Sequence, residues 1–163
     1  MRKKADLMLE EIRTLAVDPD PGGALQRICD LMRDEVEHYN WVGYYIAVPE
    51  DRLLALGPFS GKPTEHLKIP YGRGICGQAA ETQETFVVPD VMSQSNYLSC
   101  SIETKAEIVV PVFWRDSFVG ELDIDSHTVD PFTKWDDTFL NEVVLVTAPL
   151  VAAILGPAEG YLS

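Results

Sequence analysis

Residues 107–125 read EIVVPVFWRDSFVGELDID, and this stretch decides the fold. Its two apolar halves are rich in Val, Ile, Phe and Trp, which is typical of β-strands, and Arg115-Asp-Ser117 forms the turn between them. Two strands joined by so short a turn run antiparallel. The stretch therefore predicts a β-hairpin within a mostly antiparallel sheet.

A second hairpin is predicted earlier in the chain. Residues 41–48 (WVGYYIAV) and 53–59 (LLALGPF) are apolar runs, and the turn at 49–52 separates them. A further short strand is expected at 85–88, ahead of Pro89, because a proline interrupts strand pairing. These strands extend the antiparallel sheet.

Helical patterns flank and interrupt the strands. Apolar residues recur at helical spacing over 3–16 and over 24–37, where Cys29 lies on the apolar stripe and is expected to be a core residue. A short helix is expected at 74–82, after a Gly-Arg-Gly turn. A mostly antiparallel sheet with the N-terminal and C-terminal helices packed on it predicts an α+β domain.

The last helix has a recognisable beginning. Thr133 is expected to be its N-cap, with Asp136 three residues later as in a capping box. The chain of 163 residues is long enough for one domain. We expect a single domain over 1–163, with N-terminal helices at about 3–37, the sheet and site loops at 41–126, and the C-terminal helix at 133–155.

Charge and hydropathy exclude several kinds of partner. The chain has 13 basic and 26 acidic residues, a net charge of −13, which repels phosphate and disfavours nucleic acid and anionic membranes. The N-terminus lacks the apolar core of a signal peptide. The longest apolar stretch, residues 143–155, is shorter than a membrane span. We therefore expect a cytoplasmic protein with reduced thiols and no membrane partner.

The cysteines and histidines do not form a metal-binding pattern. Three cysteines are too few for a secreted disulfide framework, and no pair has the CxxC spacing of a zinc site. The three histidines are scattered along the chain. No metal and no cofactor are expected.

Acidic residues occupy alternate positions in the second strand of the predicted 107–125 hairpin. Asp123 and Asp125 share one face of that strand. Spacing alone favours a solvated edge, where two carboxylates avoid the cost of burial. Their apolar neighbours favour a pocket instead, walled by Trp41 and Tyr45 and floored by both aspartates and Glu107. Such a pocket suits an ammonium group beside an apolar tail, as in a free amino acid.

Two cysteines admit a redox interpretation. Cys76 follows Gly72-Arg-Gly74 at the expected helix N-terminus, where the helix dipole and Arg73 stabilise a thiolate. Cys100 lies between two serines in a polar segment. One thiol could be oxidised to a sulfenic acid and condense with the other to a disulfide. A structural role for both cysteines is the alternative.

Five motifs, taken together and in this order, resemble the free methionine-(R)-sulfoxide reductases, which are single GAF-domain enzymes. The resemblance covers roughly residues 24–155. It implies a GAF-like fold and the reduction of free L-methionine-(R)-sulfoxide to methionine. The motifs are NWVGYY (40–45), LGPFSGK (56–62), IPYGRGICG (69–77), AEIVVP (106–111) and GELDIDS (120–126).

The resemblance also implies roles for individual residues. Cys100 matches the catalytic cysteine of the family, and Cys76 matches a second family cysteine. The carboxylates that hold the substrate and assist protonation match Glu107, Asp123 and Asp125. The aromatic residues around the methyl and sulfoxide end match Trp41 and Tyr45. Thioredoxin or a similar dithiol is the implied reductant, and pairing through the terminal helices into a homodimer is expected.

One position departs from the family pattern. Many members carry a third, resolving cysteine shortly before the Ile-Pro of the third motif, and His66 lies near that position here. Cys76 could resolve Cys100, an external thiol could reduce the sulfenic acid, or the domain could bind without turnover. A non-catalytic GAF sensor of small molecules and a thiol redox sensor are therefore the alternative functions.

Overall fold

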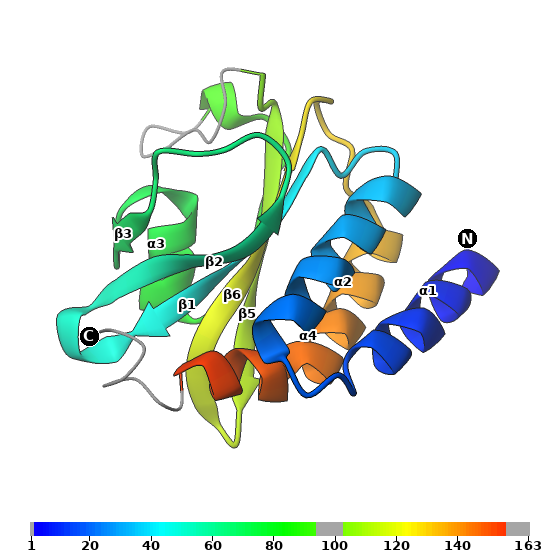
Figure 1. The fold of residues 1–163 in the computed structure, drawn as a ribbon. Helices are drawn as coiled ribbons and strands as arrows, with labels where there is room; N and C mark the ends of the chain where they lie inside the picture. Colours follow the sequence, from blue (N-terminus) through cyan, green and yellow to red (C-terminus); the bar gives the residue numbers. More distant parts are fainter. Residues whose placement is uncertain (1, 94–102, 156–163) are drawn as a thin grey trace.

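The computed structural model describes residues 2–93 and 103–155 (Figure 1). It contains one antiparallel sheet with helices packed on it, which confirms the predicted α+β class. The helices are α1 (Arg2–Leu15), α2 (Pro21–Glu35), α3 (Gly74–Thr82) and α4 (Lys134–Leu155), with single 3₁₀ turns at Pro49–Asp51 and Val91–Ser93. The strands are β1 (Trp41–Val48), β2 (Leu53–Ser60), β3 (Lys68–Pro70), β4 (Phe86–Val88), β5 (Ala106–Trp114) and β6 (Ser117–Ser126).

The six strands form one antiparallel sheet in the order β3-β2-β1-β6-β5-β4. Both predicted hairpins are confirmed, as β1–β2 and β5–β6. Arg115 and Asp116 join β5 to β6, and both have positive φ angles (51° and 66°), as a tight type I′ hairpin turn requires. The two hairpins meet along β1 and β6, so the acidic strand β6 is central in the sheet.

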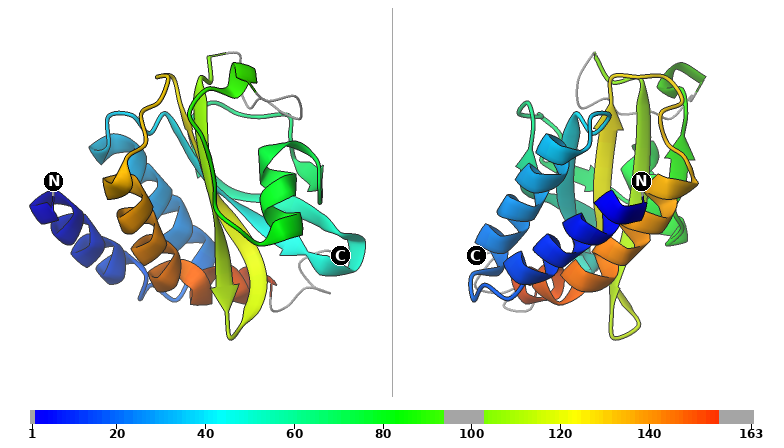
Figure 2. Two further views of the ribbon diagram at one scale, coloured as in Figure 1. Left: turned by 180° about the vertical axis from the view of Figure 1, so that it is seen from behind. Right: turned by 90° about the vertical axis from the view of Figure 1, so that its right-hand side faces the viewer.

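The two faces of the sheet are covered differently. Helices α2 and α4 pack on one face, with α1 outside them, whereas α3 lies on the opposite face (Figures 1 and 2). We call the first the helix face and the second the carboxylate face. Alternate residues of the central strands serve each face, because strand side chains alternate.

The helix face holds the larger hydrophobic core. Strands β1, β5 and β6 contribute aliphatic residues such as Val42, Ile108 and Leu122, and Cys29 of α2 is fully buried, as predicted. Helix α4 is long and apolar enough to cross a membrane by length and composition, unlike the shorter stretch considered from sequence. It is instead a core helix, because Leu140, Val143 and other residues along it are buried in this cluster.

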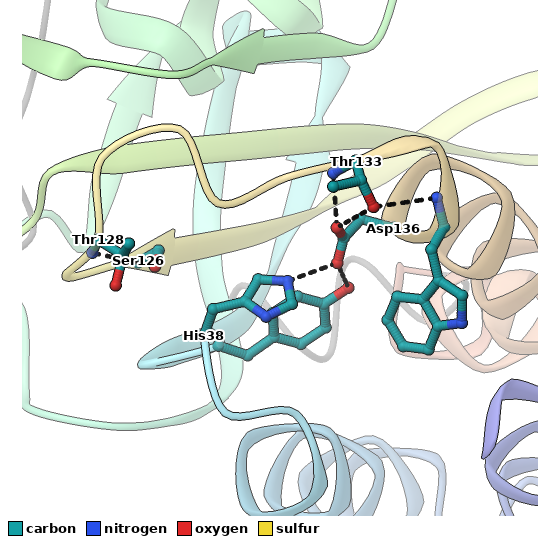
Figure 3. Close-up of polar contacts among 7 residues, drawn as sticks. His38, Ser126, Thr128, Thr133 and Asp136 are labelled. Atoms are coloured by element: carbon teal, nitrogen blue, oxygen red, sulfur yellow. Dashed lines mark hydrogen bonds and ion pairs between the residues drawn. The ribbon is translucent and has the colours of Figure 1, made fainter. Parts of the chain in front are cut away.

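Helix α4 begins with the predicted capping box (Figure 3). Thr133 Oγ1 accepts a hydrogen bond from the backbone N–H of Trp135, and the backbone N–H of Thr133 donates to Asp136 at 2.8 Å. The buried Asp136 carboxylate also lies 2.7 Å from His38 Nε2 and accepts a 2.7 Å hydrogen bond from the hydroxyl of Tyr39. This network ties the start of α4 to the segment between α2 and β1.

Helix α2 begins three residues earlier than predicted, at Pro21. Proline is well suited to the first helical position, because its missing N–H would have no partner there and its φ is already helical. The Pro-Gly-Gly run predicted to lie outside the helix therefore forms its first turn.

Strand β3 was not predicted, because its three residues are too few to show an alternating pattern. It pairs with β2 at the edge of the sheet and leads into the turn before α3. There the N–H of Gly72 donates to the carbonyl of Gly77 at 2.7 Å, and Gly72 has a φ of +87°. A Cβ on Gly77 would lie 2.5 Å from the Pro70 carbonyl oxygen, so this close turn requires glycine.

Candidate active site

The predicted site residues on strands converge on the carboxylate face. Cross-strand pairing places Trp41 of β1 and Glu107 of β5 on either side of Asp125 of β6. In the same way Gly43 and Val109 flank Asp123. Paired residues in an antiparallel sheet point to the same side, so the two aromatic residues and three carboxylates of the prediction share this face.

These acids are buried, which excludes the solvated-edge alternative. Glu107, Asp123 and Asp125 have exposed fractions of 2 %, 0 % and 1 %. Neither oxygen of Asp123 has a hydrogen-bond partner among the described residues. Buried polar groups are nearly always hydrogen-bonded, so a carboxyl without partners in a cavity points to a ligand-binding site.

Cys76 of α3 lies close to two of these carboxyl groups, those of Glu107 and Asp123. It occupies the first turn of α3, as predicted, and its thiol donates a 3.6 Å hydrogen bond to Glu107 Oε2. The Cys76 sulfur, one carboxyl oxygen of Glu107 and one carboxyl oxygen of Asp123 all lie within 4.8 Å of one another. A thiol and two carboxylates so close could share a metal ion, or could exchange protons.

Burial shifts these acids toward the neutral form. It raises the pKa of Glu107 well above its ordinary value, with the charges of Asp123 and Asp125 adding to the effect. It also raises the pKa of Asp123, although the Glu107 carboxyl and the Cys76 thiol oppose this shift. A carboxyl group whose pKa is raised by burial keeps its proton to a higher pH and can deliver that proton to a substrate.

A small cavity lies beside Cys76, Glu107 and Asp123. Its volume is about 10 Å³, roughly the room for one water molecule. This volume is smaller than a free amino acid. His66 and Arg73 also line this cavity, so the residue near the position of the third family cysteine reaches the site.

Two aromatic residues form the wall on the β1 side. The rings of Trp41 and Tyr45 are stacked with centroids 6.4 Å apart, and both side chains are buried. Trp41 Nε1 donates to the Lys62 carbonyl at 2.9 Å, and the hydroxyl of Tyr45 donates to the His66 carbonyl at 3.0 Å. These bonds fix the rings and tie the 62–66 segment to the site.

Glycine makes room for the Trp41 ring. A Cβ on Gly43 would lie 2.4 Å from a ring atom of Trp41, and a Cβ on Gly61 would lie 2.6 Å from another. Gly61 also has a φ of +140°, which disfavours other residues. Gly43 and Gly61, in the first two motifs, are therefore required so that the Trp41 ring can pack beside the site.

For two residues, the predicted site and the observed site differ. Cys100, predicted to be the catalytic thiol, lies outside the described residues. Glu121 was not predicted, yet it is fully buried on the same face as Asp123 and Asp125. The alternation that identified the two aspartates extends to Glu121, so the signal was present in the sequence.

The chain is similar to a known domain family and to several characterised proteins. The family model described as "GAF domain" matches residues 20–148. A free methionine-R-sulfoxide reductase from Saccharomyces cerevisiae is 42 % identical over 106 residues, which are 64 % of this chain and 58 % of that protein. The Escherichia coli protein of the same name is 35 % identical over 114 residues, covering 70 % and 67 %.

A solved structure extends the similarity to three dimensions. The free methionine-R-sulfoxide reductase from Neisseria meningitidis, crystallised in complex with its substrate, superposes with a TM-score of 0.83 and 32 % identity. The superposition covers 92 % of this chain and 91 % of that one.

Proposed function

The chain belongs to the GAF domain family and, within it, to the free methionine-(R)-sulfoxide reductases, and we propose that it reduces free L-methionine-(R)-sulfoxide to methionine. One observation in the structure carries the proposal. The Cys76 thiol and the carboxyl groups of Glu107 and Asp123 meet in a buried cavity. A thiol beside proton-holding acids supplies the groups that sulfoxide reduction consumes.

Recognition of the substrate follows from the two walls of the site. Asp123 and Asp125 bind the α-ammonium group, whose positive charge is attracted by two buried carboxyl groups. Trp41 and Tyr45 enclose the methyl and sulfoxide end of the side chain. A methionine within a peptide lacks the α-ammonium group and is rejected by the enclosed site.

In the first half-reaction, the Cys100 thiolate attacks the sulfoxide sulfur. Glu107 or Asp125 protonates the sulfoxide oxygen, and the raised pKa of Glu107 makes its neutral form available for this transfer. The hydroxyl group then passes from the substrate sulfur to the Cys100 sulfur, so that the sulfur–oxygen bond of the sulfoxide breaks and a sulfur–oxygen bond forms on Cys100. The sulfoxide is thereby reduced to methionine, which leaves, and Cys100 is oxidised to a sulfenic acid.

In the second half-reaction, the Cys76 thiol attacks the sulfenic sulfur and water leaves. The resulting Cys76–Cys100 disulfide is reduced by thioredoxin or a similar dithiol, which closes the cycle. Cys76 takes the resolving role because His66 stands near the position of the usual third cysteine. The position of Cys76 in the cavity supports this assignment.

The assembly and compartment are also part of the proposal. Helix α1 packs on α4 outside the layer that covers the helix face, and we expect the two terminal helices to pair two chains into a homodimer. The cytoplasm is the expected compartment, because the cycle requires reduced thiols at rest.

A turnover assay with free L-methionine-(R)-sulfoxide tests the function, first with dithiothreitol and then with thioredoxin. Cys100→Ser should abolish reduction with both reductants. Cys76→Ser should leave a single turnover intact and slow thioredoxin-dependent recycling. Cys29→Ala is the matched control, because Cys29 lies in the helix-face core and should not affect chemistry.

The sensor alternatives predict a different result. A non-catalytic GAF sensor would bind the sulfoxide without releasing methionine. A thiol redox sensor would form the Cys76–Cys100 disulfide with peroxide but leave the sulfoxide unchanged. Full sulfoxide reduction by Cys100→Ser would contradict the proposed mechanism.

A further inference from the structure

Three potential metal ligands from separate elements meet on the carboxylate face. They are the Cys76 sulfur of α3, a carboxyl oxygen of Glu107 on β5 and a carboxyl oxygen of Asp123 on β6, all within 4.8 Å of one another. None of the three residues is more than 5 % exposed. Sequence spacing does not reveal this cluster, because the ligands lie far apart in the chain and only the fold brings them together.

The separation of the thiol and the Glu107 carboxyl group matches one edge of a tetrahedral zinc site. Zinc lies about 2.3 Å from a thiolate sulfur and about 2.1 Å from a carboxylate oxygen, so two such ligands at the tetrahedral angle are about 3.6 Å apart. The Cys76 sulfur and Glu107 Oε2 lie 3.6 Å apart. The Asp123 oxygen lies within 4.8 Å of both atoms, so a small rotation of its side chain completes a site of three ligands.

The buried charges of this cluster also favour a cation. Neither Glu107 nor Asp123 forms an ion pair with a basic side chain in the described part of the chain. Asp123 is fully buried and lines the cavity beside Cys76, and its two oxygens have no hydrogen-bond partner among residues 2–93 and 103–155. Buried carboxylates are normally paired with a cation or bound to a metal, so a metal ion in this cavity would offset the cost of their burial.

The ligand atoms determine which kind of ion fits. Calcium and magnesium prefer six or more oxygen ligands, whereas a thiolate beside carboxylates suits zinc and similar thiophilic ions. The cavity of about 10 Å³ has room for one water molecule, which would fill the fourth position of a tetrahedral site. Three protein ligands and one water molecule are the usual ligand set of an open zinc site.

We propose that a thiophilic divalent ion such as Zn²⁺ binds to Cys76, Glu107 and Asp123 and excludes the sulfoxide from the site. The thiol and any protonated carboxyl group release their protons to solvent as the ion binds, and no residue is oxidised or reduced. The ion is an inhibitor rather than a cofactor, because it occupies a proton-donating acid and an acid that binds the α-ammonium group. The inhibition rests on the proposed function, whereas the binding of the metal does not.

Co²⁺ is the first probe, because a cobalt–thiolate bond gives a charge-transfer absorption band in the near ultraviolet. The full chain is used in its reduced form with Cys100→Ser, so that the proposed catalytic cysteine cannot supply the thiolate. We expect the band to appear on titration with Co²⁺ and to disappear when the more tightly bound Zn²⁺ displaces the cobalt. Competition with a chromophoric chelator then gives the Kd for Zn²⁺.

Ligand variants in the same background locate the site. Cys76→Ser should abolish the band. Asp123→Asn should weaken Zn²⁺ binding by at least about 100-fold, because the loss of even an indirect partner of a metal ion costs about 10- to 100-fold in affinity. Cys29→Ala is the matched control, because Cys29 is buried in the helix-face core and its loss should leave the band and the Kd unchanged.

Inhibition is measured as methionine release by the wild-type chain in a single turnover without reductant. With the sulfoxide well below saturation, Zn²⁺ at about ten times its Kd should reduce the rate about tenfold. Addition of EDTA should restore the original rate, because the inhibition is reversible.

Three results would overturn the proposal. The absence of a cobalt–thiolate band in Cys100→Ser would exclude the site, even if no ligand variant folded, and a band that persisted after Cys76→Ser would place the metal elsewhere. Unchanged methionine release with Zn²⁺ bound would exclude the competition with sulfoxide. If the wild-type chain released no methionine without Zn²⁺, the proposed function would fail, whereas the cobalt spectra would still decide the metal site.

Discussion

The two faces of the sheet differ in whether their buried polar groups are hydrogen-bonded. On the helix face, the hydroxyl of Tyr44 donates to Thr147 at 2.9 Å, and Asp136 accepts several hydrogen bonds. On the carboxylate face, Asp123 and Glu121 are equally buried but lack hydrogen-bond partners among the described residues. Satisfied polar groups stabilise a fold, whereas unsatisfied ones are available to a ligand.

The same strands serve both faces. On β6, Leu122 and Ile124 enter the hydrophobic core, and the acids at 121, 123 and 125 point the other way. The comparison teaches that a GAF sheet can separate stability from chemistry by simple alternation. Substitutions on each face should therefore have distinguishable consequences.

The largest effect is expected on catalysis, for Glu107→Gln. The amide cannot give up a proton as the neutral acid does, so methionine release should fall about 10²- to 10⁴-fold with little loss of stability. Steady-state turnover and thermal unfolding measure the two quantities. Glu84→Gln, at an exposed position, is the control. Normal turnover by Glu107→Gln would remove this residue from the chemistry.

A large effect on stability is expected on the opposite face, for Ile124→Ala. Ile124 is fully buried in the helix-face core, and its truncation should lower the free energy of unfolding by about 2–5 kcal/mol. Urea denaturation measures this loss, with the half-exposed Val87→Ala as the control. The folded molecules should reduce the sulfoxide at the wild-type rate. A large loss of turnover per folded molecule would show that the helix face also determines the chemistry of the carboxylate face.

A smaller effect of opposite sign is expected for Glu121→Met. Replacement of the unpartnered carboxyl by an apolar side chain should raise the free energy of unfolding by about 1–3 kcal/mol near pH 7. The raised pKa means that the folded protein holds a proton that the unfolded chain has released, so wild-type stability falls as pH rises above the ordinary pKa of glutamate. Unfolding measured from pH 5 to pH 8 should show a weaker decline in the variant; an unchanged slope would mean that Glu121 is ionised in the fold.

The smallest effect is expected at the capping box of α4. Thr133→Ala should lower the free energy of unfolding by about 1 kcal/mol at neutral pH and leave activity unchanged. A calorimetric comparison of the variant with the wild type measures the change. A large loss of activity would connect this network to the site.

Low pH should also weaken the hydrogen-bond network of Asp136 at the start of α4. Burial alone would raise the pKa of Asp136, but hydrogen bonds from His38, the Thr133 backbone and Tyr39 outweigh it and lower the pKa. The stabilisation is therefore present above the ordinary pKa of aspartate and is lost as pH falls below it. In Asp136→Asn, unfolding should depend less on pH between pH 5 and pH 2, and an unchanged acid dependence would contradict this account.

Local signals made much of this structure predictable. The hairpin around Arg115 and Asp116, the short helix that carries Cys76 and the capping box at Thr133 all follow from neighbouring residues. Strand alternation also placed Asp123 and Asp125 on one face of their strand, and Trp41 and Tyr45 on one face of theirs. These predictions needed no knowledge of which strands are neighbours.

The remaining features depend on contacts between distant parts of the chain. Spacing alone suggested that Asp123 and Asp125 lie on a solvated edge, and they are buried because β6 lies between β1 and β5. Strand β3 is defined by its pairing with β2 rather than by its own pattern. His66 enters the cavity because its segment is held by Tyr45. Cys100 lies outside the described residues, so its role stays a prediction.

The most direct test of the central claim is a single-turnover measurement on the intact chain with free L-methionine-(R)-sulfoxide and no reductant. We predict the release of one equivalent of methionine per chain, with the loss of two thiols, and the loss of this release in both Cys100→Ser and Glu107→Gln. Binding of the sulfoxide by the wild-type chain without release of methionine would contradict the claim, because the acids of the carboxylate face would then hold a ligand without reducing it.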